Sequence, residues 1–180
     1  MKNYLNIISL NNISIYLLLS FPAFLVVGPL LAEISMNLIN IFFLYKLFNE
    51  KNFKFLKEKF FFIFIAFYIY IFLNIFLSNY INDILIKHIF YFRHIIFVFA
   101  VADLLLRNKN LILFFYKILT VTILIISIDG IIQFLFGNNI LGFPKLRPDR
   151  LSGFFEDKMV LGSYIARLFP LLIGLFIYNL

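Results

Sequence analysis

Long apolar runs separated by short polar segments dominate the chain. The first run extends from Ile13 to Phe48 and would measure about 54 Å as one helix, which is too long for a single bilayer span. Gly28-Pro29 lies near its middle, and this dipeptide favours a turn over a helix. We therefore predict two spans, 13–28 and 31–48, joined by a tight hairpin, with Pro22 bending the first.

The rest of the chain contains four more apolar runs of membrane-spanning length. They predict spans at about 60–77, 88–106, 111–129 and 160–178, with a long polar loop at about 130–158. The predicted fold class is all-α, a polytopic transmembrane helical bundle of about six spans. We find no repeat, linker or second domain, so residues 1–180 are predicted to form a single transmembrane region.

The distribution of lysine and arginine predicts the orientation of these spans. The segment NEKNFKFLKEKF, residues 49–60, is the most basic connection, and the positive-inside rule places it in the cytoplasm. An even number of spans then leaves both termini in the cytoplasm. This orientation places nine of the 16 basic residues inside: Lys2, Lys46, Lys51, Lys54, Lys57, Lys59, Arg107, Lys109 and Lys117.

Five of the remaining basic residues gather in or beside the outer 130–158 loop, against the positive-inside rule. They are Lys145, Arg147, Arg150, Lys158 and Arg167. A diphosphate needs several positive donors fixed in space, and an arginine fork bonds two oxygens at once. The acids Asp149, Glu156 and Asp157 nearly neutralise this cluster, so an ordinary salt-bridged loop is the other interpretation.

Composition excludes several classes of function. The chain is 63% hydrophobic and 14% charged, which is more apolar surface than a soluble domain of 180 residues can bury, so we expect a lipid bilayer around it. With no cysteine, it has no disulfide, iron–sulfur cluster or catalytic thiol. His88 and His94 face different directions on a helix, so we expect no metal site. The net charge of +7 comes without a basic–aromatic platform for nucleic acid.

Two arginines lie within predicted spans. Arg93 sits inside the fourth span, where an arginine in hydrocarbon costs at least about 2.5 kcal/mol. It either snorkels to the outer headgroups or pairs with Asp83 or Asp129, or it lines a polar cavity for an anionic lipid headgroup. Arg167, inside the sixth span and before Pro170, either snorkels along the helix or faces the same outer mouth.

Other polar and small residues mark the ends of the predicted spans. Asp129-Gly130 and Gln133 are interpreted as closing the fifth span, with Asp129 either a helix-end residue or a cavity residue that orients Arg93 or Arg150. Asp103 is interpreted as a solvated helix-end partner of Arg107. Gly162, Ser163 and Ala166 form a small-residue stripe suited to close helix packing.

The stretches IDGIIQFLFGNNILGF and RLSGFFEDKMVLGSYIARLFPLLIG together resemble the O-antigen ligase and O-antigen polymerase superfamily of bacterial membrane glycosyltransferases. The pattern is an aspartate and a glutamine at a span end, a G-x-x-x-x-G turn, R-L-x-G-x-F, a further glycine and a prolyl helix. The matching residues are Asp129, Gln133, Gly137, Gly142, Arg150, Leu151, Gly153, Phe155, Gly162 and Pro170. GPLLAEI, between the first two spans, is also similar to that family.

This resemblance implies an enzyme of the bacterial inner (cytoplasmic) membrane that acts in lipopolysaccharide or surface polysaccharide synthesis. Such enzymes take a glycan from an undecaprenyl-diphosphate carrier at the outer face, without a metal or nucleotide cofactor. Arg150 matches the family's diphosphate-binding arginine, whereas Arg147, Arg93 and Arg167 are candidates by position. Transfer to lipid A-core and transfer to a growing chain are not distinguished.

The family's later outer loop, with its catalytic histidine, has no counterpart in these 180 residues. We therefore expect an N-terminal portion of a longer protein, and no catalytic residue is assigned. The alternative is a non-catalytic multi-span membrane protein, such as a transporter segment or an assembly subunit.

Overall fold

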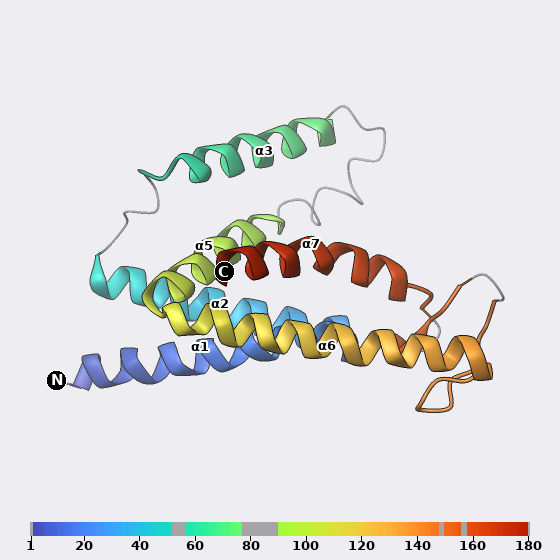
Figure 1. The fold of residues 1–180 in the computed structure, drawn as a ribbon. Helices are drawn as coiled ribbons and strands as arrows, with labels where there is room; N and C mark the ends of the chain where they lie inside the picture. Colours follow the sequence, from blue (N-terminus) through green and yellow to red (C-terminus); the bar gives the residue numbers. More distant parts are fainter. Residues whose placement is uncertain (1, 52–56, 77–89, 148–149, 156–157, 180) are drawn as a thin grey trace. The chain divides into compact units, whose positions relative to one another are not determined.

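A computed structural model describes residues 2–51, 57–76, 90–147, 150–155 and 158–179. These residues form six α-helices and no β-strand, which confirms the all-α prediction (Figure 1). The helices are α1 (Lys2–Val27), α2 (Pro29–Glu50), α3 (Lys59–Phe76), α5 (Phe92–Arg107), α6 (Lys109–Phe136) and α7 (Leu161–Asn179). A short 3₁₀ turn, η2 (Gly153–Phe155), precedes α7.

Four helices are long and apolar enough to cross a membrane: α1 from residue 10, α2, α6 and α7. A shorter apolar stretch lies in α3, at Lys59–Asn74. Only 6% of the apolar stretch of α7 is buried within the chain, so most of its surface must contact lipid or another protein. The chain is a membrane protein, and the count of about six spans with both ends in the cytoplasm stays a prediction.

The break between α1 and α2 lies where the sequence predicts it. Gly28 interrupts the helix, and its N–H donates to the Phe24 carbonyl at 3.0 Å. Pro29 begins α2, where the missing N–H of proline removes no helical hydrogen bond. Pro22 lies inside α1.

The fifth predicted span is too short, because α6 continues from residue 129 to Phe136. The interpretation of Asp129-Gly130 and Gln133 as helix-closing residues is therefore wrong. The helix ends at Gly137, which adopts a left-handed conformation with φ +80° and donates its N–H to the Gln133 carbonyl at 3.1 Å. The loop after α6 accordingly begins at residue 137 rather than 130.

Contacts within the chain divide it into two compact units. The first comprises residues 1–14 and 36–106; the second comprises 15–35 and 107–180. In the first unit, aromatic rings join α3 to α5, with Phe61 and Phe64 at 5.7 and 6.1 Å from Phe99 between ring centroids. Tyr68 and Phe92 lie 6.0 Å apart in the same way.

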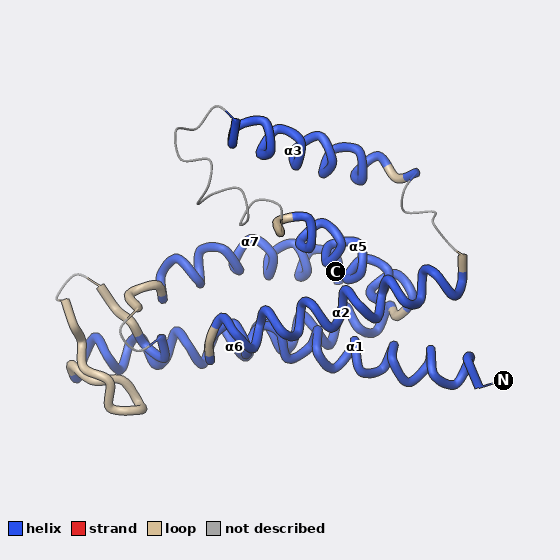
Figure 2. Tube along the Cα trace, turned by 180° about the vertical axis from the view of Figure 1, so that it is seen from behind, coloured by secondary structure: helices blue, strands red, loops and turns tan. Residues whose placement is uncertain are grey.

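In the second unit, α7 packs against α6 and runs in the opposite direction, and η2 contacts both helices (Figure 1). The described loop residues between α6 and α7 gather beyond the C-terminal end of α6 (Figure 2). This end of the second unit carries most of the motif residues.

Candidate functional site

Gln133 is the centre of a buried polar cluster between α6 and the loop that follows it. Its side-chain Oε1 accepts hydrogen bonds from the backbone N–H groups of Ser152, at 3.0 Å, and Gly153, at 2.9 Å. Its Nε2 donates to Ser152 Oγ at 3.0 Å and to the Phe143 carbonyl at 3.4 Å. One side chain on α6 therefore satisfies the backbone at two distant points of the loop.

Asp129 lies one helical turn before Gln133 and contacts the first part of the same loop. Asp129 Oδ1 accepts the Ile140 N–H at 2.9 Å, and Oδ2 lies 3.5 Å from Asn139 Nδ2. Asn139 Nδ2 also donates to the Gly153 carbonyl at 2.9 Å, and its Oδ1 accepts the Phe143 N–H at 2.7 Å. Asn139 thus links the beginning of the loop to its end.

We call the side chains of Asp129, Gln133, Asn139 and Ser152 the polar latch. Their exposed fractions are 0%, 0%, 5% and 2%, respectively. Buried polar groups are tolerated when they are hydrogen-bonded and are expensive when they are not. The latch therefore holds the loop in one arrangement on the end of α6, since breaking these contacts would leave buried groups unsatisfied.

Between the latch contacts, residues 137–145 form a tight hairpin. The Lys145 N–H donates to the Gly137 carbonyl at 2.7 Å, and the Asn139 N–H donates to the Phe143 carbonyl at 3.0 Å. Gly142 donates its N–H to the Asn139 carbonyl at 3.0 Å, at the turn that the sequence predicts there. Lys145 Nζ lies 4.7 Å from the centre of the Phe134 ring, a cation–π contact with α6.

Arg147 and Arg150 are brought together by the backbone that follows this hairpin. An isolated antiparallel bridge pairs the two residues, and both side chains are exposed on the chain. Two residues after Arg150, Ser152 enters the latch. The buried latch therefore fixes the backbone from which these arginines project. Asp149, Glu156 and Asp157, which were interpreted as neutralising this cluster, lie outside the described residues.

Arg167 lies apart from this pair, on the wall of a cavity in the second unit. The cavity measures about 520 Å³ and is lined by the Gly28-Pro29 turn, Phe154 and Phe155, and one side of α7 with Tyr164 and Arg167. Lys158 also lines it, so two cations face one space. Tyr164 secures α7 to α1, because its hydroxyl donates to the Pro22 carbonyl at 2.7 Å.

Arg93 belongs to the first unit, where it is the second residue of α5. Its backbone carbonyl accepts a hydrogen bond from Asn40 Nδ2 of α2 at 2.9 Å. Asp83, one of its proposed partners, lies outside the described residues. Of the four candidate arginines, only Arg147 and Arg150 are adjacent within the second unit.

The motif glycines Gly153 and Gly162 differ in how much space the neighbouring atoms leave for a side chain. Gly153 has φ +55°, and a Cβ atom there would lie 2.5 Å from Leu161 Cδ1 and 3.1 Å from Asp129 Oδ2. At Gly162, by contrast, an added Cβ would meet no atom of the described chain within 4 Å. The close packing expected at the Gly162 stripe is therefore not seen within the described residues.

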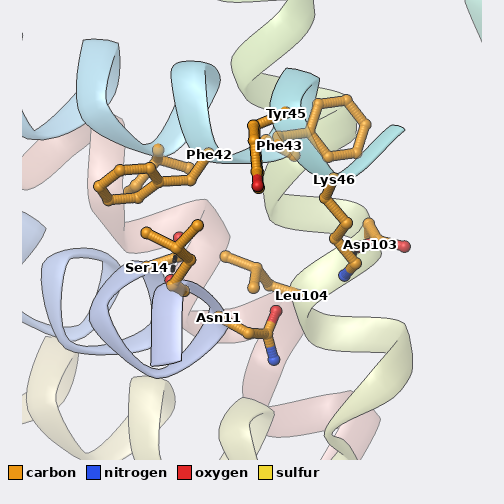
Figure 3. Close-up of a pocket in the computed structure, with 11 residues that line it drawn as sticks. Asn11, Ser14, Phe42, Phe43, Tyr45, Lys46, Asp103 and Leu104 are labelled. Atoms are coloured by element: carbon orange, nitrogen blue, oxygen red, sulfur yellow. Dashed lines mark hydrogen bonds and ion pairs between the residues drawn. The ribbon is translucent and has the colours of Figure 1, made fainter. Parts of the chain in front are cut away.

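A second polar contact, which is partly buried, lies in the first unit. Lys46 Nζ of α2 and Asp103 Oδ2 of α5 form an ion pair of 2.6 Å, with side chains 11% and 26% exposed. A small cavity of about 20 Å³ adjoins the pair and is lined also by Asn11 and Ser14 of α1 (Figure 3). The sequence assigned Asp103 to Arg107, four residues away, and so missed the partner on another helix.

No group of three or more His, Cys, Asp and Glu side chains suited to a metal ion occurs among the described residues. The sequence also missed two latch residues, since neither Asn139 nor Ser152 was singled out as a candidate. No protein-family model, curated protein or solved structure matches this chain, so its resemblance to the ligase and polymerase superfamily rests on the motif residues.

Proposed function

We propose that the chain binds an undecaprenyl-diphosphate-linked glycan at the outer face of the bacterial inner membrane, as part of an O-antigen ligase-like or polymerase-like glycosyltransferase. The observation that carries this proposal is the polar latch. Asp129, Gln133 and Gly153, separate positions of the motif, contact one another or share partners, and the loop they hold carries Arg150.

The latch explains why such a loop would suit a diphosphate. Two exposed arginines three residues apart on a mobile segment would have to be ordered when the ligand binds, which weakens binding. Here the backbone next to Arg150 is already held by hydrogen bonds to buried Gln133. The two guanidinium forks of Arg147 and Arg150 can then share the oxygens of one diphosphate.

In this proposal Arg150 has a defined chemical role. Its guanidinium binds the diphosphate of the carrier and stabilises the negative charge that grows on it when the glycosyl bond to the phosphate breaks. Arg147 adds a second positive group beside it. The latch residues are positioning residues that do not touch the ligand.

Glycan transfer in cells that express the protein from its own gene tests the proposal. We expect Arg150→Ala to abolish transfer while membrane insertion and protein level stay normal. Lys145→Ala is the matched control, because it removes a cation from the same loop that lies over the Phe134 ring. Wild-type transfer by Arg150→Ala would refute the diphosphate role.

A further inference from the structure

The cavity beside α7 is lined by both charged and apolar side chains. Lys158 and Arg167 line it, whereas no acidic residue does so among the described part of the chain. Both side chains are exposed on the protein. The N-terminal end of α7, which begins at Leu161 between them, adds the positive end of its helix dipole.

The position of Arg167 along α7 favours an anionic partner for its guanidinium group. It lies inside the membrane-spanning stretch of α7, six residues or about 9 Å beyond its start. An arginine at hydrocarbon depth costs at least about 2.5 kcal/mol unless it reaches a polar partner. A phosphate group in the adjoining cavity would supply that partner.

A second cavity, of about 380 Å³, lies next to the first. The two share Val26, Val27 and Phe154 as lining residues. The second is otherwise lined by apolar side chains and Thr122, including Ile126, Leu141 and Phe143. A cavity lined by two cations therefore lies beside an apolar chamber. A phospholipid has a matching pair of parts, an anionic phosphate and an apolar acyl chain.

We propose that these cavities bind one anionic bilayer phospholipid, with its phosphate between Lys158 and Arg167 and one acyl chain beside Phe154. An anionic phospholipid has a phosphate for the two cations and an acyl chain for the adjoining apolar chamber, and such lipids are part of the bilayer around the chain.

A single tryptophan reports on the chamber directly, because the chain contains none. Phe154→Trp places the fluorophore on the wall that the two cavities share. The 180-residue chain is reconstituted in vesicles in which brominated phosphatidylglycerol or brominated phosphatidylcholine quenches nearby tryptophan. We expect half-maximal quenching at about a tenfold lower mole fraction of phosphatidylglycerol, because the choline cation of phosphatidylcholine offsets the charge of its phosphate and is repelled by Lys158 and Arg167.

Three controls make the result specific. Adding Lys158→Gln and Arg167→Gln to the Phe154→Trp protein should remove the preference for the anionic lipid. Phe169→Trp, at an exposed position of α7, should show no preference. Adding Arg150→Gln to Phe154→Trp should leave the preference unchanged, since this site does not use Arg150, so that failure of the diphosphate proposal and failure of this one are separable.

Two outcomes would overturn the inference. One is equal quenching by both lipids in Phe154→Trp, or a preference that survives removal of both cations. The other is displacement of the brominated lipid by undecaprenyl phosphate at a far lower mole fraction than by phosphatidylglycerol, which would assign the cavity to the carrier lipid. Native mass spectrometry of the unsubstituted protein gives the same comparison if Phe154→Trp does not fold: retention of phosphatidylglycerol is expected, and retention of neither lipid refutes the site.

Discussion

Gln133 and Ser152 hold each other through two hydrogen bonds: the Ser152 N–H donates to Gln133 Oε1 at 3.0 Å, and Gln133 Nε2 donates to Ser152 Oγ at 3.0 Å. The residues lie 19 positions apart, on α6 and on the final part of the loop. This reciprocal contact closes the loop that carries Arg147 and Arg150.

Removing the Gln133 amide should loosen the loop without removing α6. Gln133→Leu has a similar size but leaves the N–H groups of Ser152 and Gly153 buried without an acceptor, at about 1–3 kcal/mol for each group. We expect a lower thermal midpoint in detergent and faster proteolysis within residues 137–155. Ile131→Leu, at an exposed position of the same helix, should change neither. An unchanged midpoint and cleavage rate in Gln133→Leu would contradict the latch.

Gly153→Ala should destabilise the same region by a different route. Its left-handed backbone disfavours a side chain by about 1–2 kcal/mol, and a methyl group would also force the ends of the Leu161 and Asp129 side chains to shift, so we expect a loss of about 1–3 kcal/mol. Gly174→Ala is the control, because an added Cβ there meets nothing within 4 Å and alanine favours a helix. Equal midpoints for the two alanine variants would show that Gly153 is not required.

The Lys46–Asp103 ion pair should be sensitive to losing one partner only. Lys46→Met leaves the Asp103 carboxyl group without this cation, and we expect a loss of about 1–3 kcal/mol because the pair is only partly exposed. Lys46→Met combined with Asp103→Leu should recover much of it, since neither charge then remains. The thermal midpoints of both single variants and of the double variant measure this coupling. A stability loss in the double variant equal to the sum of the two single losses would exclude it.

The predicted orientation can be measured because the chain has no cysteine. Single cysteines at Glu50, the last residue of α2, and at Leu146, in the exposed loop, provide two reporters. In intact cells, a membrane-impermeant maleimide should label the loop position and spare the α2 position. The reverse labelling would invert the topology, and labelling at both positions would change the number of spans between them.

The turn at Gly28-Pro29 and the all-α class follow from apolar run length and two helix-breaking residues, and both are local properties of the sequence. The length of α6 could not be predicted in the same way. Asp129 and Gly130 are poor helix residues, but Asp129 accepts the Ile140 N–H, and Gly130 leaves space for Leu161 Cδ2, which would lie 3.1 Å from a Cβ there. Tertiary contacts decide that helix end.

The hydrogen bonds of the polar latch could not be predicted from the local sequence either. Gln133 and Gly153 were selected through the motif, but nothing in the sequence showed that they touch. Asparagine is common in turns, so the residue type of Asn139 does not indicate a buried contact. The residues next to Ser152 in the sequence do not indicate one either. Their partners lie 10 to 20 residues away, so only the folded chain shows that they form one cluster.

Binding of undecaprenyl diphosphate to the purified full-length protein in lipid nanodiscs tests the central claim most directly. We expect Arg150→Gln to weaken binding at least about tenfold, because a charge-assisted contact is lost. We also expect Gln133→Leu to weaken it although Gln133 does not touch the ligand, while Ile131→Leu and Lys145→Gln bind as the unsubstituted protein does. Unchanged affinity in both Arg150→Gln and Gln133→Leu would contradict the account.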